Sequence, residues 1–429
     1  MPARPVLRYL GPMGFRFLHA ADIHLDSPLL GLSRRHELMG RAFAHASRQA
    51  LTNLVDRAIV LEVAFVVIAG DLFDGDWKDF STGLAFQREA GRLCRAGIRL
   101  FVLHGNHDAD SVISRRLPMP DGAFVFPSNR AATYELPEHD VVLHGRSFAT
   151  REERSSLLPH YPAPVPGRFE IGVLHTACEG REGHASYAPC TVGELAAHGY
   201  DYWALGHVHA REILSERPHI VFPGNLQGRH ANEPDAKGAT LVTVRDGHVA
   251  EIEPITLDAA RWASLTVDAG GLTEREGLLD RVSRALGKAS DEAGGRPLAL
   301  RLRLAGATRL HGFLQAARPQ VIAEIEAIAS HIAEDIWLER LLVATADPAG
   351  HESRPEADAL AGFVNDLTEA AAAEAMAGRL TSEWQTLVAK LPPGLAGSLP
   401  VDDPEGRSAL LDEARDLALA RLTGAGTAD

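Results

Sequence analysis

The sequence predicts a layered α/β protein that continues into a second, smaller α/β unit and a helical C-terminal tail. Short apolar runs bounded by glycine or polar residues indicate buried strands. Longer stretches with helical spacing lie between several of these runs, and such alternation is typical of α/β layers. The order and spacing of the expected strands and helices change near residue 262, which marks the start of the second unit.

Five apolar runs provide the framework of the first unit, and they lie at 15–21, 63–70, 98–105, 169–176 and 200–207. Helices are expected between several of them, around 36–62, 81–96 and 191–198. The strand-like runs DVVLHG, HIVFPG, ATLVTV and HVAEIEPI have short connections and are expected to add antiparallel or mixed strands. We therefore expect the first domain to span residues 1–257.

The second unit follows the order strand, helix, strand, helix, strand. Its elements are expected at 262–269, 272–288, 298–306, about 309–332 and 336–345. They define a compact domain over residues 258–347. Residues 348–429 begin with a linker that contains Pro and Gly and continue as amphipathic helices. The segment LPPGLAGSLPVDDPEG interrupts them before a last helix near 406–422.

The composition favours a soluble, cytoplasmic protein with packed cores. Of the 429 residues, 45% are hydrophobic, and the chain has no uninterrupted apolar stretch of about 20 residues that would predict a membrane span. The first residues show neither a long apolar segment nor a small-residue cleavage site. The three cysteines, Cys94, Cys178 and Cys190, lack C-x-x-C spacing, which argues against a disulfide framework and a cysteine zinc site.

The net charge of −14 is unevenly distributed along the chain. Residues 351–429 contain 14 Asp and Glu against 6 Lys and Arg, which gives −8 and leaves −6 for residues 1–350. The chain is thus not coated with phosphate-binding cations, although its first 350 residues can hold a local basic surface. Charge alone does not point to nucleic acid.

Candidate metal ligands follow the ends of all five framework strands. They are Asp22 and His24, Asp71 and Asp74, Asn106, His107 and Asp108, His175, and His207 and His209. In open α/β sheets ligands bind beyond the carboxyl ends of the strands, so these residues can meet in one place. Asp22 and His24 are two positions apart, and in an extended segment their side chains would point the same way.

The residue types at these strand ends suit a pair of divalent cations. Imidazole, carboxylate and amide oxygen ligands favour manganese, iron or zinc, and the lack of thiolates disfavours a structural zinc or iron–sulfur site. Two cations about 3.5 to 4 Å apart can clamp a phosphate and a hydroxide, provided that a carboxylate bridges them. The pattern therefore predicts a dinuclear centre for phosphoester hydrolysis.

The motifs D-x-H, GD-x-x-D, GNHD, a later His and GH-x-H, in this order, resemble the calcineurin-like metallophosphoesterase superfamily. The flanking segments HAADIHLDSP, GDLFD and FPGNLQGRH are similar to bacterial DNA-repair exonucleases of the SbcD type, particularly their YhaO branch. The resemblance covers residues 15 to about 235 and implies a layered metallophosphoesterase sandwich. The second unit is placed where SbcD-type nucleases carry a capping domain that helps to hold DNA.

The resemblance also implies a role for each position. One metal would be held by Asp22, His24 and His209, and the other by Asn106, His175 and His207, with Asp71 as the bridge. His107 would be the catalytic histidine, which stabilises the transition state or protonates the leaving oxygen. Asp108 would orient the His107 ring.

Several further residues keep alternative interpretations. Asp74 could bind a metal-bound water, support the metal ligands or cap the following turn. Arg229 and His230 could contact a substrate phosphate or be ordinary surface residues. His19 and His104, which lie in apolar strands just before the motifs, are expected to be packing residues.

The resemblance implies a metal-dependent DNA nuclease, an exonuclease or endonuclease, in which a metal-activated hydroxide hydrolyses the phosphodiester. Two divalent cations are expected; manganese is favoured, and magnesium, iron and zinc are compatible with the ligands. The expected partners are DNA and a coiled-coil ATPase of the SbcC type that engages the helical tail during DNA repair. A homodimer is also compatible with the resemblance.

Two other classes of function compete with this interpretation. The acidic net charge favours a phosphatase or phosphodiesterase for nucleotides or other small phosphoesters. A non-enzymatic interaction module on the same fold is disfavoured, because all seven ligand positions and His107 are present.

Overall fold

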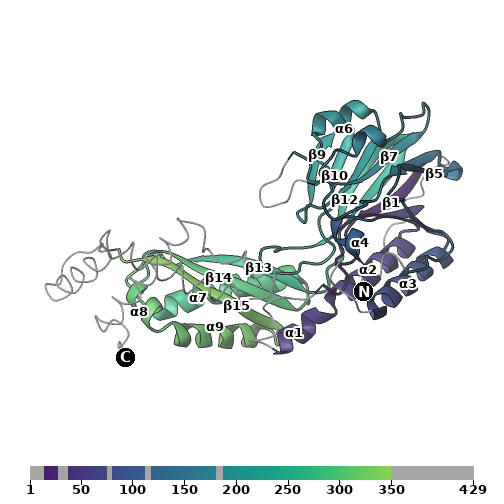
Figure 1. Ribbon diagram of the computed structural model, residues 1–429. Helices are drawn as coiled ribbons and strands as arrows, with labels where there is room; N and C mark the ends of the chain where they lie inside the picture. Colours follow the sequence, from purple (N-terminus) through teal and green to yellow (C-terminus); the bar gives the residue numbers. More distant parts are fainter. Residues whose placement is uncertain (1–13, 28–36, 75–79, 112–116, 180–186, 349–429) are drawn as a thin grey trace, which may run out of the picture. The chain divides into compact units, whose positions relative to one another are not determined.

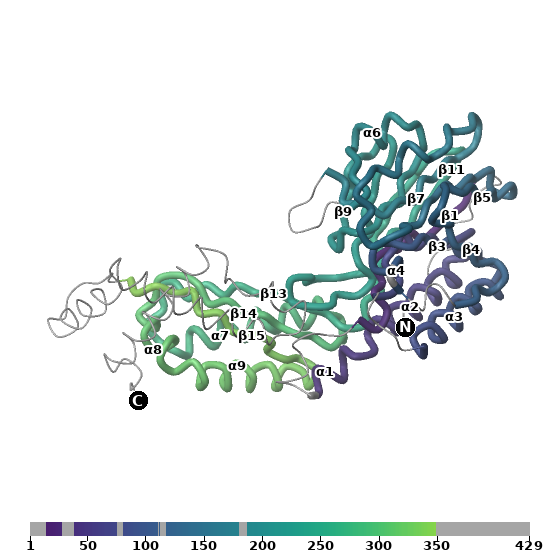
Figure 2. The backbone as a smooth tube through the Cα atoms, viewed as in Figure 1, coloured from purple at the N-terminus to yellow at the C-terminus, as the bar shows by residue number. Residues whose placement is uncertain are grey.

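The computed structural model divides the chain into two compact units (Figure 1, Figure 2). Of the residues that the structure describes, those up to 263 and 291–300 form the large unit, and 264–290 and 301–348 form the small unit. The structure describes residues 14–27, 37–74, 80–111, 117–179 and 187–348. The domain bounds 1–257, 258–347 and 348–429 stay predictions, and the helical tail expected to engage a partner lies outside the described residues.

The first sheet of the large unit has the strand order β12-β11-β1-β2-β3-β4. Its strands are β1 (Gly14–Ala20), β2 (Phe65–Ala69), β3 (Arg99–Leu103), β4 (Ala123–Val125), β11 (Gly238–Arg245) and β12 (His248–Thr256). Strands β1 to β4 pair in parallel, whereas β11 pairs antiparallel with both β1 and β12. The sheet is therefore a parallel core with an antiparallel edge, as the mixed strand pattern predicted.

The second sheet has the order β5-β6-β7-β8-β10-β9. Its strands are β5 (Ala132–Leu136), β6 (Val141–Gly145), β7 (Phe169–His175), β8 (Tyr202–Gly206), β9 (Glu212–Glu216) and β10 (His219–Phe222). Strands β6, β7, β8 and β10 pair in parallel, and the two edge strands are antiparallel to their neighbours. Strands β4, β5 and β9 were not predicted, because they are short and lack a continuous buried run.

The two sheets pack face to face through a shared apolar core. Phe17 and Phe65 of the first sheet stack with ring centroids 4.9 Å apart, and Tyr202 of the second sheet meets Phe17 edge-on. Each of these fully buried rings stabilises the fold by roughly 1.5–3 kcal/mol relative to an exposed position. The large unit is therefore a sandwich, in agreement with the predicted layered α/β class.

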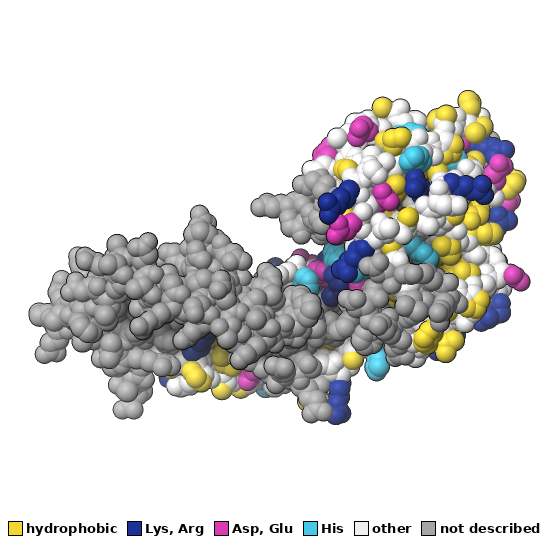
Figure 3. All heavy atoms as spheres, viewed as in Figure 1, with side chains coloured by type: hydrophobic (Ala, Val, Ile, Leu, Met, Phe, Trp, Pro, Cys, Tyr) yellow, Lys and Arg dark blue, Asp and Glu magenta, His cyan; other side chains and the backbone are white. Residues whose placement is uncertain are grey.

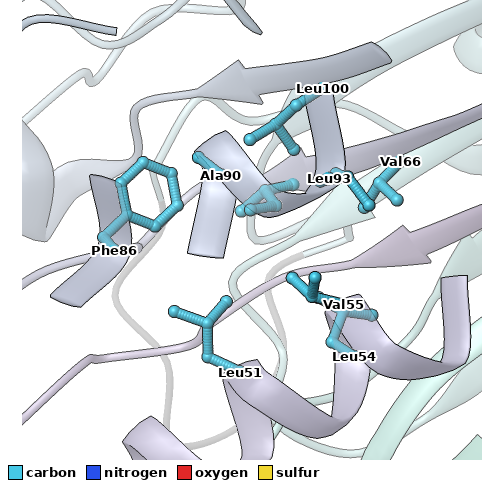
Figure 4. A pocket seen from close by; sticks show the side chains of 9 residues that line it. Leu51, Leu54, Val55, Val66, Phe86, Ala90, Leu93 and Leu100 are labelled. Atoms are coloured by element: carbon cyan, nitrogen blue, oxygen red, sulfur yellow. The ribbon is translucent and has the colours of Figure 1, made fainter. Parts of the chain in front are cut away.

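Helices cover the outer faces of the sandwich. Helix α2 (Ala46–Val60) and helix α3 (Phe80–Arg95) lie on the first sheet, preceded by α1 (Glu37–Ala44), and α6 (Val192–His198) packs on the second. Figure 4 shows apolar side chains of α2 and α3, including Leu54 and Leu93, around a small cavity next to the first sheet. The expected helices at 36–62, 81–96 and 191–198 are thus confirmed, the first as two helices.

The register of the parallel strands brings their carboxyl ends to one edge. Ala20 pairs with Ile68 and Ala69 pairs with Leu103, so β1, β2 and β3 end side by side. In the second sheet His175 pairs with Gly206. One or more of the expected ligands follow or end each of the strands β1, β2, β3, β7 and β8. The order and direction of these strands therefore bring the ligands together.

The small unit is built around the sheet β13-β14-β15. The elements that contribute to it are β13 (Arg261–Asp268), α7 (Arg275–Ala293), β14 (Leu298–Ala307), α8 (His311–Ala316), α9 (Arg318–Ile332) and β15 (Ile336–Ala346). The first residues of β13 and β14 and the last residues of α7 belong to the large unit. The helix expected over 309–332 is divided at Ala317, because Pro319 lacks an N–H and suits only a first helical turn. Among the residues that the structure describes, no helix is both long and apolar enough to cross a membrane.

Candidate metal centre

The backbone after β1 and β2 does not continue as an extended strand. Asp22, His24 and Asp71 have φ values of 50°, 43° and 52°, in the left-handed region that costs non-glycine residues energy. Backbone hydrogen bonds between the two loops hold this conformation: the N–H of Asp22 donates to the carbonyl of Gly70 at 3.0 Å, and that of His24 to Asp71 at 2.9 Å. The expectation that Asp22 and His24 converge because they share an extended strand is wrong, although both do face the site.

One set of ligand atoms comes from Asp22, His24 and His209, which lie within 4.8 Å of one another. Nε2 of His24 is 3.3 Å from Nε2 of His209, and the latter is 3.9 Å from Oδ1 of Asp22. The Asp22 carboxylate also accepts the backbone N–H of His207 at 3.0 Å. The set thus joins the loops after β1 and β8.

A second set is formed by Asp71, His175 and His207, with Asn106 beside it. Nε2 of His175 is 3.0 Å from Oδ1 of Asn106 and 3.4 Å from Oδ2 of Asp71. The same Oδ2 is 3.9 Å from Nε2 of His24, a member of the first set. One oxygen of Asp71 therefore faces both sets of ligands.

When these rings are neutral, the hydrogen bonds behind them hold the proton on Nδ1 and leave the Nε2 lone pair facing the site. Nδ1 of His24 donates to Asp74 at 2.8 Å, Nδ1 of His209 to Glu233 at 2.6 Å, and Nδ1 of His175 to the carbonyl of Ala69 at 3.0 Å. A neutral imidazole with its proton on Nδ1 has an acceptor at Nε2. The facing Nε2 atoms of His24 and His209 then cannot bond to each other, whereas a cation between them satisfies both.

The charges of the site also favour a cation. Burial lowers the pKa of His175, but the carboxylates of Asp71 and Asp22 outweigh it and raise that pKa to about 9. Burial raises the pKa of Asp22 to about 6, against the opposing effect of His209 and His175. The carboxylates that favour the protonated form of His175 also favour a divalent metal ion at this place, so the donor set fits such ions.

His107 differs from the ligands because its side chain is 31% exposed. Its Nδ1 is 2.9 Å from Oδ1 of Asp74, and its ring meets that of His24 edge-on at 4.9 Å. Burial lowers the pKa of His107, but the hydrogen bond with Asp74 and the charge of Asp71 raise it by more. The pKa of His107 is therefore above that of an ordinary histidine. Asp74 therefore contacts two rings of the site, and the choice among its three expected roles stays a prediction.

Asp108 has contacts other than the expected one with the His107 ring. Its carboxylate, 1% exposed, accepts the backbone N–H groups of Leu72 at 3.0 Å, Phe73 at 2.8 Å and Gly105 at 3.1 Å. Asp108 belongs to the short helix α4 (Asn106–Asp110), so these bonds tie the loop after β2 to the start of that helix. The expectation that Asp108 orients His107 is corrected, because Asp74 makes that contact.

Comparison with known proteins agrees with this geometry. The calcineurin-like phosphoesterase family model matches residues 15–211, and the model of the middle domain of metallophosphoesterase YhaO matches residues 262–346. The uncharacterized metallophosphoesterase YhaO of Bacillus subtilis is 31% identical over 332 residues, which cover 76% of this chain and 80% of YhaO. The chain belongs to the calcineurin-like metallophosphoesterases.

Two more distant relatives have names that refer to DNA repair or to a nuclease. The DNA double-strand break repair protein Mre11 of Sulfurisphaera tokodaii is 24% identical, over 60% of this chain and 67% of that protein. The SbcD component of the Escherichia coli nuclease SbcCD is also 24% identical, over 60% of this chain and 72% of that component. The resemblance drawn from the motifs is thereby confirmed at the level of the family.

The metallophosphoesterase centre opens into a cleft of about 850 Å³. Asp71, His107, His207 and His209 line it together with residues of the loop after β10. Arg229 and His230, 24% and 52% exposed, belong to that loop and thus lie beside the centre. Glu233 in the same loop was not predicted from the sequence, because no motif spacing connects it with His209.

Glycines precede Asp71, Asn106 and His207 in this metallophosphoesterase, and a side chain at any of the three would collide with a neighbouring group; at Gly70 that group is the ring of His175. A Cβ atom at Gly105 would collide with Oδ1 of Asp71, and one at Gly206 would collide with the carbonyl of Ala69. The G-N and G-H pairs of the motifs therefore combine a ligand with the space that it needs.

Proposed function

We propose that this metallophosphoesterase is a DNA nuclease that hydrolyses phosphodiester bonds at a centre of two divalent cations. One observation carries the dinuclear part: Oδ2 of Asp71 lies 3.9 Å from Nε2 of His24 and 3.4 Å from Nε2 of His175. A carboxylate that faces two ligand sets can hold two cations at the short separation that phosphoryl transfer requires. Bound cations would also offset the cost of burying the polar side chains around Asp71 away from water.

The proposed ligand sets follow from these contacts. Asp22, His24 and His209 would hold one cation, and Asn106, His175 and His207 the other, with Asp71 between them. When bound, the cations supply Lewis acidity toward the phosphate and an activated water as the nucleophile. Nitrogen and oxygen donors without thiolate suit manganese, which we propose as the working metal; iron and zinc are compatible with the same donors.

His107 is proposed to act on the leaving group. It is exposed to the cleft, and its raised pKa keeps the ring protonated at a higher pH than that of an ordinary histidine. A protonated imidazole can donate a proton to the departing sugar oxygen or stabilise its charge. Asp74 holds the ring through Nδ1, which leaves Nε2 available for that contact.

Arg229 and His230 are proposed to bind the phosphate backbone of the substrate beside the centre. Both line the cleft, and Nη2 of Arg229 lies 3.5 Å from Nδ1 of His209. A guanidinium offers several donors to a phosphate and is more specific for its geometry than a lysine. The small unit, over the expected range 258–347, is proposed as a capping domain that helps to hold DNA.

The relatives support a nucleic acid substrate and a partner. The names of Mre11 and of the SbcCD nuclease refer to double-strand break repair and to a nuclease with more than one component. We therefore propose a cytoplasmic role in DNA repair together with a coiled-coil ATPase of the SbcC type. Exonuclease and endonuclease action are both compatible with an open cleft. A homodimer is also compatible with this proposal.

Hydrolysis of nucleotides or other small phosphoesters is the second candidate. On the face of the large unit seen in Figure 3, Lys and Arg side chains are interspersed with Asp and Glu, without a broad field of one sign. DNA-binding surfaces are usually far more basic. A small substrate would need only the cleft.

An assay on a panel of substrates separates the two candidates. Linear, circular and hairpin DNA are incubated with manganese or magnesium, in parallel with a small chromogenic phosphodiester. A nuclease cleaves DNA in a metal-dependent manner. Turnover of the small diester with intact DNA would instead support the second candidate.

A further inference from the structure

Glu233 lies in the loop between β10 and β11, and only 6% of its side chain is exposed. Its Oε1 accepts a hydrogen bond from Nδ1 of His209 at 2.6 Å. Its Oε2 accepts the side-chain amide of Asn225 and the backbone N–H of Arg229, both at 2.8 Å. A single buried carboxylate thus joins a ligand histidine to the loop that lines the cleft.

The bond from His209 to Glu233 fixes the direction of the ring. With the Nδ1 proton directed to Glu233, Nε2 keeps its lone pair and faces His24 at 3.3 Å. The main chain of His209 is held separately, because its carbonyl accepts the N–H of Asn225 at 3.2 Å and Nζ of Lys237 at 3.3 Å. Rotation of the ring about its own bonds is therefore restricted by Glu233.

The same carboxylate links the ligand to a cation on the cleft wall. Nη2 of Arg229 is 3.6 Å from Oε1 of Glu233 and 3.5 Å from Nδ1 of His209. The negative charge of Glu233 offsets the repulsion between the Arg229 guanidinium and any positive charge at His209. Removal of Glu233 would leave the Arg229 guanidinium directly beside a histidine that has to bind a metal.

We propose that Glu233 is a positioning residue of the metal centre, which fixes His209 with Nε2 toward the cation and holds Arg229 beside it. The proposal rests on the proposed dinuclear centre and adds a residue that none of its motifs contains. Carboxylates behind metal-bound imidazoles typically affect metal affinity about 10- to 100-fold. We expect an effect of that size on the cation held by Asp22, His24 and His209.

The chain offers a matched control in Glu170. This carboxylate is 2% exposed, accepts Nε2 of His144 at 2.5 Å and also accepts the backbone N–H of Val165 at 3.0 Å. The pair therefore repeats the burial and bonding of Glu233 with His209. His144 lies in β6 and belongs to neither ligand set, so loss of Glu170 reports the purely structural cost.

The experiment compares Glu233→Ala and Glu233→Gln with Glu170→Ala and Glu170→Gln in the full chain. Metal-free protein is titrated with Mn²⁺ by calorimetry, and the thermal midpoint is recorded for each variant. For Glu233→Ala we expect one of two Mn²⁺ equivalents to bind about 10- to 100-fold more weakly, with a smaller loss for Glu233→Gln. The Glu170 variants should lower the thermal midpoint and bind both equivalents as the wild type does.

Wild-type affinity for both equivalents in Glu233→Ala would overturn the positioning role. Equal losses of affinity in the Glu233 and Glu170 variants would also overturn it, because they would reflect stability alone. If the alanine variant does not fold, the glutamine variant is judged by the same criteria. Fewer than two equivalents in the wild type would refute the centre itself, whereas intact DNA with normal metal binding would refute only the proposed nuclease activity.

Discussion

Nδ1 of His107 lies 2.9 Å from Oδ1 of Asp74, and this contact joins the short helix α4 (Asn106–Asp110) to the loop after β2. The same oxygen accepts Nδ1 of His24 at 2.8 Å. A ligand histidine and the proposed catalytic histidine thus depend on one carboxylate. Substitution of that carboxylate should therefore affect both rings.

Asp74→Asn should reduce turnover by roughly 10- to 100-fold, because the neutral amide no longer orients two imidazoles as strongly. The Asp74 carboxylate favours protonated His107, so its loss should lower the pKa of that ring. If protonated His107 is the active form, the alkaline limb of the pH–rate profile moves to lower pH. A limb that stays in place would separate Asp74 from the catalytic histidine.

His107→Ala should keep the metals and lose turnover. The side chain belongs to neither metal set that we propose, and loss of a general acid typically costs roughly two to four orders of magnitude in rate. Metal content and substrate affinity are measured beside turnover. Wild-type turnover, or loss of the metals, would contradict the role assigned to His107.

Asp108→Ala should act mainly on stability. It leaves the buried N–H groups of Leu72, Phe73 and Gly105 without their acceptor, at a cost of about 1–3 kcal/mol for each unpaired group. Urea denaturation should therefore show a much lower midpoint. If Asp108 oriented His107 instead, turnover would fall while the midpoint stayed near that of the wild type.

His19 should make the stability of the metal-free protein depend on pH. Burial lowers its pKa to about 3, and the neutral ring donates to the carbonyl of Leu205 while it accepts the hydroxyl of Tyr202. The unfolded chain takes up this proton first as the pH falls below about 6.5, so stability is present above that pH and is lost toward pH 3. Each pH unit in this window costs up to about 1.4 kcal/mol.

Denaturation of the wild type and of His19→Gln at pH 7, 6 and 5 measures this contribution. The variant lacks the titrating ring, so the difference in unfolding free energy between the two proteins should shrink as the pH falls. A constant difference would show that His19 does not carry the pH dependence. Other titrating groups affect both proteins alike and cancel in the comparison.

The strand framework was predictable because each buried strand is a short apolar run that ends at a glycine or a polar motif. Parallel pairing then brings Asp22 and Asp71 to one edge of the first sheet. The packing of the second sheet against the first places His175, at the end of β7, beside Asp71. His19 could also be separated from the ligands, since it lies inside a run rather than beyond its end. It is fully buried and bonded to Tyr202, as expected of a packing residue.

Other features depend on tertiary contacts that no spacing encodes. The left-handed conformations of Asp22 and His24 are held by bonds to a loop almost 50 positions away. The choice between Asp74 and Asp108 as partner of His107 follows from the direction of each turn, and both residues have the same chemistry. Glu233 reaches His209 because the loop after β10 lines the same cleft.

The central claim is that Asp71 bridges two catalytic cations, and metal content measured together with turnover tests it most directly. Metal-free wild-type protein should bind two equivalents of Mn²⁺ and gain phosphodiesterase activity as the second one binds. Asp71→Ala should weaken both sites and abolish hydrolysis, because two cations would repel each other without their common anion. Two retained equivalents with full turnover in Asp71→Ala, or wild-type turnover that survives removal of all metal, would contradict the account.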